Sequence, residues 1–425
     1  MYENLNKKKL LIIGSDTGNI NFINAAREMG VYTIAADGIT DHSKAPAKRA
    51  ADEAWDINYF DTDAIVRKCQ DSGVDGVIAG YSEFRVLAAC RIANKLGTPF
   101  YANEDQINLT RNKRTFKDAC LQYDIPTPKD YCFSYPMSEE EKAMIEYPVI
   151  VKPADYAGRK GISVCGSPDE LDAAVEYAAG YSECKTVIVE EYLDGVEFAA
   201  VYTLSKGKIS LSCVNEKYIT DDQEVKTGLC EFLVSPAKFT THYITELDGR
   251  IRNFIRGIGA KDGVIFFQGM VTDKKIYVFE MGYRINGNND FLVIERFNKI
   301  NFMKMLIAHS LCGDMCDDLS KDNPHYSQYA CTLPFYAHGG TVGKISYESL
   351  YNKPGITDIT GIAWEGKEIP EDGSTAQCVL KLKLTAQTRE EIVELVEFAQ
   401  KHLVVEDVNG KNMLFKPFDA RILLK

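Results

Sequence analysis

The sequence lacks a long apolar run and an excess of positive charge, and each absence excludes a class of protein. No apolar stretch approaches the roughly 18 residues of a membrane-spanning helix, and the first residues lead into a short strand rather than a signal peptide. Acidic residues outnumber basic ones by 61 to 49, which gives a net charge of −12 and leaves no basic stripe for a phosphate backbone. We therefore expect a cytoplasmic protein that binds neither a membrane nor a nucleic acid.

Paired metal-binding motifs and a nucleophilic triad are also missing. The twelve cysteines are scattered singly, which in a cytoplasmic chain predicts reduced thiols. His309, Cys312 and Cys316 share a helical spacing, but a structural zinc ion needs a fourth ligand, and no second pair follows at zinc-site spacing. Core packing is therefore the preferred interpretation of this helix. Without a Ser-His-Asp or Cys-His grouping, catalysis is expected to depend on positioning and electrostatics.

The N-terminal quarter, residues 1–107, has the pattern of a doubly wound parallel α/β domain. Short apolar runs that end in turns predict strands from residue 9 and at 31–37, 76–80 and 99–102, with helices at 20–29, 63–72 and 83–96 between them. The turn at 14–18 lacks the full GxGxxG pattern of a dinucleotide site. An ordinary strand-to-helix turn is the favoured interpretation there.

The rest of the chain divides into a central domain, residues 108–325, and a C-terminal α+β subdomain, residues 326–425. The central domain is expected to begin with an amphipathic helix that two prolines end, and to carry a lid subdomain at roughly 128–188. The other expected elements are strands at 147–152 and within 186–234, 263–281 and 376–383, and helices at 243–259, 301–312 and 388–401.

The chemistry of the chain is concentrated around Glu280 and Arg284, four residues apart. Gln268 lies twelve residues before Glu280, at the end of a strand-like run. Carboxylate and amide oxygens suit a hard ion such as Mg²⁺, whereas a planar guanidinium suits phosphate or a developing oxyanion. ATP-driven activation of an acyl group needs this combination.

Further charged residues lie upstream in a fixed order. Lys113 and Lys152 come first, a glycine loop with Gly158, Arg159, Lys160 and Gly161 follows, and then an acidic strand end at 190–197. Each feature alone is weak, because a lysine at a strand end is usually solvated and a Gly-x-x-Gly segment is usually a turn. Their order and spacing, together with Gln268, Glu280 and Arg284, resemble the ATP-grasp family throughout the central domain.

The resemblance implies a role for each residue. It implies ATP and Mg²⁺ as cofactors, with Mn²⁺ as an alternative ion, and a mobile glycine loop that closes over the phosphates. Glu191 would offer its carbonyl oxygen to the adenine amino group and Leu193 its N–H to the ring, with Glu190 assisting and Glu197 accepting from the ribose. The implied ATP-binding residues are Lys113, Lys152, Gly158, Arg159, Lys160, Gly161, Glu190, Glu191, Tyr192, Leu193 and Glu197.

The metal, catalytic and substrate residues follow from the same resemblance. Glu280, Gln268 and Asn286 (or Asn288 in place of Asn286) would bind the metal, and Arg284 would stabilise the acyl phosphate and the tetrahedral intermediate. Lys217 would be a further phosphate or carboxylate contact, although a surface lysine is the favoured interpretation of this residue. Arg284 and Glu83 would face the acceptor substrate, although a carboxylate at a helix start also explains Glu83.

Two positions depart from the family pattern. The family usually has Glu-x-Asn-x-Arg, whereas position 282 is glycine here, and its upstream metal ligand is usually acidic, whereas this chain has Gln268. The resemblance as a whole implies an α/β and α+β protein: a preceding α/β domain, an ATP-grasp domain with a mobile lid, and a C-terminal subdomain like that of biotin carboxylase and carbamoyl phosphate synthetase members.

The implied activity is ATP-dependent ligation of a small carboxylate to an amine, by a protein that the family suggests is a homodimer. Carboxylation with bicarbonate, or a step of purine synthesis, is the enzymatic alternative. A nucleotide-binding accessory protein that no longer turns over is the alternative from another class, because of Gln268 and Gly282.

Overall fold

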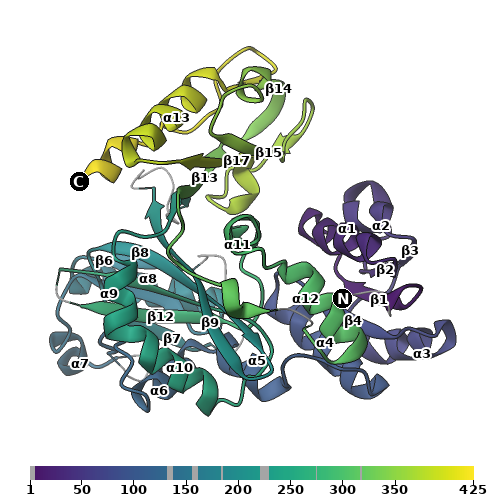
Figure 1. Cartoon of the computed structure of the whole chain (residues 1–425). Helices are drawn as coiled ribbons and strands as arrows, with labels where there is room; N and C mark the ends of the chain where they lie inside the picture. Colours follow the sequence, from purple (N-terminus) through teal and green to yellow (C-terminus); the bar gives the residue numbers. More distant parts are fainter. Residues whose placement is uncertain are drawn as a thin grey trace.

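The structure is a computed structural model, and it describes residues 5–131, 137–155, 161–182, 185–220, 229–273, 275–315 and 318–425. The chain folds into a central body that carries a parallel α/β unit on one side and an α+β unit above it (Figure 1). Within the described residues, none of the helices is long and apolar enough to cross a membrane.

The N-terminal unit is a four-stranded parallel sheet in the order β3-β2-β1-β4, which confirms the predicted doubly wound α/β architecture. The strand order reverses between β1 and β4, and ligands of open α/β sheets bind at such a point. The elements are β1 (Lys9–Ile13), α1 (Ile20–Glu28), β2 (Tyr32–Ala36), α2 (Pro46–Ala50), β3 (Glu53–Trp55), α3 (Thr62–Ser72), β4 (Gly76–Ala79) and α4 (Glu83–Leu96).

One predicted strand of this unit is wrong. Residues 99–102 form no strand, because Tyr101 turns away from the sheet to pack edge-on against Tyr283 at 5.3 Å between ring centroids. The Tyr101 hydroxyl donates to the backbone oxygen of Tyr283 at 3.2 Å. This contact fastens the end of the N-terminal unit to the segment that carries Arg284.

An eight-stranded sheet in the order β12-β11-β8-β9-β10-β13-β17-β15 forms the body. It runs without a break from the central part into the C-terminal part through the antiparallel pairing of β10 with β13. The domain boundary predicted at residue 325 therefore lies next to a sheet that continues across it. The predicted domain boundaries remain predictions. The strands are β8 (Val196–Ser205), β9 (Lys208–Ile219), β10 (Cys230–Ser235), β11 (Gly263–Val271), β12 (Ile276–Gly282), β13 (Tyr329–Tyr336), β15 (Ile356–Gly361) and β17 (Cys378–Ala386).

A small antiparallel sheet lies within the predicted lid. Its strands are β5 (Val149–Pro153), β6 (Ser163–Cys165) and β7 (Val187–Glu191), in the order β6-β5-β7. Side chains alternate between the two faces of a strand, so Val149 and Val151 pack into a core with helix α8 (Leu171–Tyr181). Lys152 and Glu190 project from the opposite face.

The remaining helices hold these sheets together. Helix α12 packs against α1 and β4 of the N-terminal unit, as Figure 1 shows, and Lys8 there donates to the backbone oxygen of Leu311 at 2.8 Å. The other elements are α5 (Glu104–Arg111), α6 (Lys113–Leu121), α7 (Glu139–Ala143), α9 (Thr240–Tyr243), the π-helix Ile244–Asp248, α10 (Gly249–Gly257), α11 (Asp290–Asn298), α12 (Phe302–Cys312), β14 (Gly340–Ser346), β16 (Glu368–Ile369), α13 (Arg389–His402) and β18 (Val404–Asp407).

The cysteine-bearing helix α12 has the packing role that its sequence favours. His309 is buried, and Cys312 donates to the backbone oxygen of Ala308 at 3.1 Å. No group of three His, Cys, Asp or Glu side chains with the geometry of a metal site occurs in the described parts of the chain. Cys316, the third member of the candidate zinc group, lies outside them.

Candidate functional site

The inner face of the lid sheet carries a buried charge cluster. Glu190 lies opposite Ile150 of β5, and Lys152 lies two residues along that strand, so both side chains point the same way. Lys152 pairs with one oxygen of Glu190. The side chains are almost fully enclosed, with residue exposures of 6% for Lys152 and 2% for Glu190. The Lys152 ammonium also lies over the ring of Phe279, 5.5 Å from its centroid.

Lys117 is a member of this cluster that the sequence analysis missed. It lies on α6, is 4% exposed, and donates to the second oxygen of Glu190 at 2.5 Å. It also lies 3.8 Å from Asp130, which faces Glu190 across a β-bridge. The available signal was the i, i+4 spacing from Lys113, which places both lysines on one side of the helix.

The charge on Glu190 depends on these two lysines. Burial by itself raises the pKa of this carboxyl, but Lys152 and Lys117 outweigh burial and bring the pKa below its ordinary value. Glu190 is therefore an anion between two cations. Glu190 serves as their counter-ion, whereas the resemblance implied a contact with the adenine amino group.

Lys113 connects the lid cluster to the metal-directed residues. It begins α6, and its backbone N–H donates to the oxygen of Ala154, just after β5, at 3.1 Å. Burial lowers the pKa of the Lys113 ammonium; the negative charges of Glu280, Glu190 and Glu83 counteract this effect, while the charge of Lys152 adds to it. The structure thus brings together charges from α4, α6, β5, β7 and β12.

Glu280 and Gln268 face each other directly across β12 and β11. The pairing shifts by one residue immediately afterwards, so that Phe279 is unpaired. Such bulges are common beside active sites, where they redirect a side chain. Both Glu280 and Gln268 are only partly buried. Their oxygens suit Mg²⁺, which binds through one or two protein ligands and completes its shell with phosphate oxygens and water.

Position 282, where the family usually has asparagine, has no room for a side chain. A Cβ atom on Gly282 would lie 2.4 Å from two ring carbons of Phe266, which faces it on β11. The same Phe266 ring supports the guanidinium of Arg284, whose carbon lies 5.2 Å from the ring centroid. The departure from the family pattern is therefore built into the packing around Arg284.

Gly282→Asn is expected to lower the free energy of unfolding by about 2 kcal/mol and to leave the affinity for Mg²⁺ unimproved, because the new side chain overpacks against Phe266. Urea denaturation and Mg²⁺ titration measure the two quantities. Gly287→Asn is the matched control, since a Cβ there meets no atom within 4 Å. A Gly282→Asn protein as stable as this control would contradict the steric explanation.

Arg284 is held by an acidic residue of the N-terminal unit. Its Nε donates to Glu83 Oε1 at 2.5 Å, and its terminal nitrogen pairs with the same oxygen. Glu83 is the first residue of α4, directly after β4. The two residues predicted to face the acceptor substrate thus meet where the N-terminal unit contacts the central body. The guanidinium of Arg284 is ion-paired with the carboxylate of Glu83.

The predicted ribose contact, Glu197, is paired with Lys217. They lie opposite each other on β8 and β9, with Lys217 Nζ 2.8 Å from Glu197 Oε2. Lys217 is largely buried, so the favoured interpretation of it as a surface lysine is wrong. Among the predicted adenine contacts, Glu191 ends β7, and Tyr192 and Leu193 follow it, with Tyr192 exposed.

Both polar atoms of the Asn286 side chain are hydrogen-bonded to nearby residues. Its amide nitrogen donates to Asp290 at 2.6 Å, and its amide oxygen accepts from the N–H of Asn288 at 3.2 Å. The predicted metal contact would require this oxygen to change partners.

In the glycine loop, Gly158, Arg159 and Lys160 lie outside the described residues. Gly161 is described and has a φ of 76°, a backbone conformation that favours glycine.

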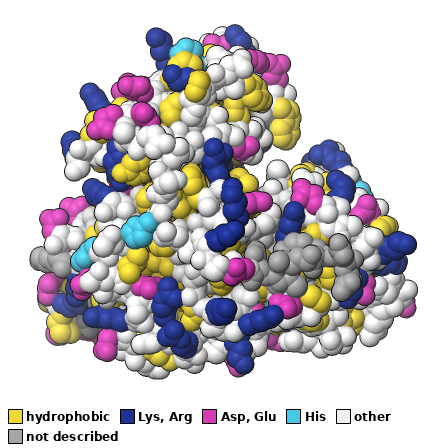
Figure 2. Space-filling model, viewed as in Figure 1, with side chains coloured by type: hydrophobic (Ala, Val, Ile, Leu, Met, Phe, Trp, Pro, Cys, Tyr) yellow, Lys and Arg dark blue, Asp and Glu magenta, His cyan; other side chains and the backbone are white. Residues whose placement is uncertain are grey.

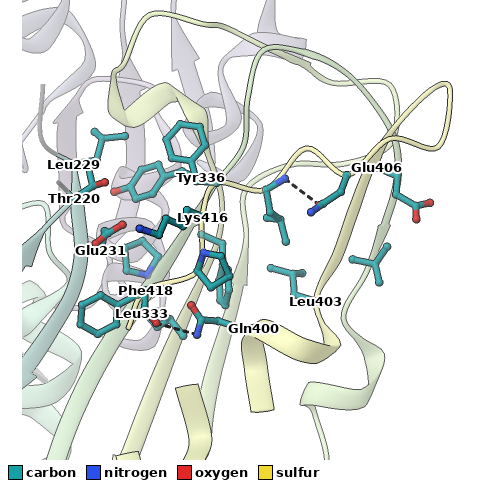
Figure 3. A pocket seen from close by; sticks show the side chains of 17 residues that line it. Thr220, Leu229, Glu231, Leu333, Tyr336, Gln400, Leu403, Glu406, Lys416 and Phe418 are labelled. Carbon is teal, nitrogen blue, oxygen red and sulfur yellow. Dashed lines mark hydrogen bonds between the residues drawn. The ribbon is translucent and has the colours of Figure 1, made fainter. Parts of the chain in front are cut away.

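The surface near the site shows where cations gather. Lys and Arg side chains follow the hollow between the C-terminal unit at the top and the N-terminal unit at the right (Figure 2). A separate cavity of about 270 Å³ lies between the C-terminal unit, which contributes Tyr336, Lys416 and Phe418, and the central body, which contributes Thr220 and Glu231 (Figure 3). None of the predicted site residues lines this cavity.

Comparisons with known proteins agree with this geometry. Residues 145–289 match the family model of the ATP-grasp domain. The chain is 28% identical to a formate-dependent phosphoribosylglycinamide formyltransferase of Bacteroides thetaiotaomicron over 285 residues, which are 65% of this chain and 70% of that protein.

Two solved structures share the fold. The L-amino acid ligase of Bacillus licheniformis has a TM-score of 0.79 at 16% identity, covering 95% of this chain and 99% of its own. The biotin carboxylase domain of the Hydrogenobacter thermophilus 2-oxoglutarate carboxylase, a dimer in complex with MgADP and bicarbonate, has a TM-score of 0.76 at 19% identity and covers 94% and 90%. The predicted fold is confirmed, and the match to the family model identifies an ATP-grasp domain at residues 145–289.

Proposed function

We propose that this chain is an ATP-dependent ligase that joins a small carboxylate to an amine through an acyl phosphate, releasing ADP and phosphate. One observation carries the proposal: Lys113 lies close to Lys152 and Glu280, and also to Glu83. The carboxylate of Glu83 is in turn bound by the guanidinium of Arg284. Cations for phosphate, an oxygen ligand for a metal and a guanidinium for the acyl group are thereby supplied in one place.

The chain's own residues would act by position and charge. Lys113 and Lys152 neutralise the phosphates of ATP, so that an anionic carboxylate can approach the γ-phosphorus. A carboxylate oxygen forms a bond to that phosphorus while the bond to the β–γ bridging oxygen breaks, and ADP leaves. The amine nitrogen then attacks the acyl carbon, loses a proton, and phosphate leaves. Arg284 would stabilise the negative oxygens in both steps.

Glu280 and Gln268 would hold Mg²⁺, which when bound would offset the negative charge of the ATP phosphates. The donor set fits, because one carboxylate and one amide oxygen are opposed and partly exposed. Mn²⁺ prefers similar oxygen ligands. With a single carboxylate in the pair, the site depends on the nucleotide for the rest of the coordination.

Gln268→Glu is expected to lower the Mg²⁺ concentration needed for half-maximal ADP release about 5- to 10-fold, because it adds a second anionic ligand opposite Glu280. Without metal, the two facing carboxylates repel each other, so the variant is also expected to be less stable than the wild type in EDTA. Mg²⁺ titrations of ADP release and of thermal unfolding measure the two effects. An unchanged Mg²⁺ requirement would count against Gln268 as a metal ligand.

The deciding experiment measures ADP and phosphate release from MgATP in pools of amino acids, small carboxylates and amines. Release that requires one carboxylate and one amine, with an amide product found by mass spectrometry, supports the proposal. Release with bicarbonate, or with formate and a phosphoribosylated amine, would move the function to the carboxylases or to the formyltransferase relative. ATP binding without turnover under any substrate would favour an accessory role, for which Gln268 and Gly282 are the reasons.

The cellular setting is part of the proposal. All nine cysteines in the described parts of the chain are free thiols, which supports a reducing compartment such as the cytoplasm. We also propose a homodimer, because the biotin carboxylase neighbour is one. Light scattering tests the oligomeric state.

A further inference from the structure

A loop directly after Arg284 is fastened to the C-terminal unit by one buried lysine. Residues 285–289, the 285–289 loop, connect β12 to α11. Lys383 of β17 reaches this loop and donates to the backbone oxygens of Asn288 at 3.3 Å and Asn289 at 3.2 Å. Its third partner is the Thr332 hydroxyl, at 2.6 Å. Lys383 is only 6% exposed, so these three acceptors account for its three donors.

The position of Lys383 in the sheet explains its reach. It lies opposite Thr332 of β13 and Asp358 of β15, so it is flanked on both sides by paired strands. A charged lysine is rarely enclosed in this way without compensating partners. Two of the three partners are backbone atoms of a loop that is about 95 residues away in sequence, and the connection therefore serves the geometry of that loop.

The 285–289 loop is stiff enough to transmit this restraint to Arg284. Arg284 donates to the backbone oxygen of Ile285 at 2.9 Å. At the other end, Asn289 has a φ of 61°, a left-handed conformation that a side-chain-bearing residue adopts only when its surroundings enforce it. Asp290, directly after the loop, accepts one hydrogen bond from Asn286 at 2.6 Å and another from Asn215 of β9 at 3.2 Å.

We propose that Lys383 is a positioning residue, by which the C-terminal unit sets the orientation of Arg284 through the 285–289 loop. This proposal rests on the function proposed above, because it assigns a role to Arg284 in amide formation. It gives the C-terminal unit a part in the reaction although none of the predicted site residues belongs to it.

The first experiment compares Lys383→Met with Lys381→Met in the full chain, with the substrates found in the turnover screen. Both variants lose one positive charge from β17, but Lys381 makes no hydrogen bond to the 285–289 loop. Lys383→Met is expected to lower kcat for amide formation about 30-fold while the Kd for MgATP changes less than about threefold; Lys381→Met is expected to match the wild type. Equal kcat values for the two variants would overturn the proposal.

A second experiment decides the matter even if Lys383→Met does not fold. Lys383→Gln keeps a polar side chain at this position, but its amide group has two N–H donors in place of three and carries no charge. Its kcat for amide formation is expected to fall about tenfold while the Kd for MgATP changes less than about threefold. A kcat equal to that of the wild type would overturn the proposal. A wild type that turns over no substrate would instead refute the ligase function, so the two failures are distinguishable.

Discussion

Arg284→Met is expected to slow amide formation about 100- to 1,000-fold and to change MgATP affinity less than about threefold, because the guanidinium is placed to stabilise oxyanions of the transition states. Methionine keeps most of the side-chain volume over the Phe266 ring, which now supports Arg284. Single-turnover kinetics with quenched-flow detection of the amide, combined with calorimetric titration of MgATP, separates the two effects.

Glu83→Gln is the control for this result. It removes the charge that pairs with Arg284 and keeps the shape, so a purely structural role of the ion pair would make both variants equally slow. We expect Glu83→Gln to lose less than about tenfold, since Arg284 remains available to the acyl group. If Arg284→Met abolished ATP binding instead, the transition-state role assigned to Arg284 would be wrong.

Lys152→Met is expected to raise the Kd for MgATP about 10- to 150-fold, because a charge-assisted contact to phosphate contributes roughly 1.5–3 kcal/mol. Lys117→Met is its matched control, since Lys117 and Lys152 each neutralise one oxygen of the buried Glu190. Removing either lysine leaves Glu190 with one counter-ion, and we expect both variants to lose about 3 kcal/mol of stability.

The two variants are expected to differ in nucleotide affinity. Lys152 faces Phe279 and lies near Lys113, on the side of the metal-directed residues. Lys117 points to Asp130, so its loss should weaken MgATP binding less than about fivefold. Calorimetry and urea denaturation on both proteins give the comparison. Equal losses of MgATP affinity would mean that Lys152 acts only through Glu190 and contacts no phosphate.

Most secondary structure was readable from the sequence, because the patterns that determine it are local. The apolar run Val149 to Val151 before Lys152 predicts a strand, and the structure has strand β5 there. The strand predicted at 99–102 failed because Tyr101 satisfies its hydroxyl on Tyr283, far away in the chain. Helix α11 was missed because the asparagine-rich loop before it resembles a longer turn.

The candidate site was readable only as a set of residue types in order. Lys113, Lys152, Glu190, Glu280 and Arg284 were all named from the sequence, and the structure places them around one another. Lys117 and Lys383 were not named, because a lysine in an amphipathic helix or in a strand is usually solvated. Burial, which the sequence does not show, separates these two from most other lysines in the described parts of the chain.

The sequence by itself determined the parallel N-terminal sheet, the order of the charged residues along the chain and the resemblance of the central domain to the ATP-grasp family, since each follows from spacing along the chain. The tertiary structure alone decided which charges meet. Its ion pairs join residues 38, 73 and 201 positions apart, and whether such charges neutralise each other depends on distance and exclusion of water, which no local pattern encodes. For the same reason, only the folded chain shows that Phe266 leaves no space for a side chain at Gly282.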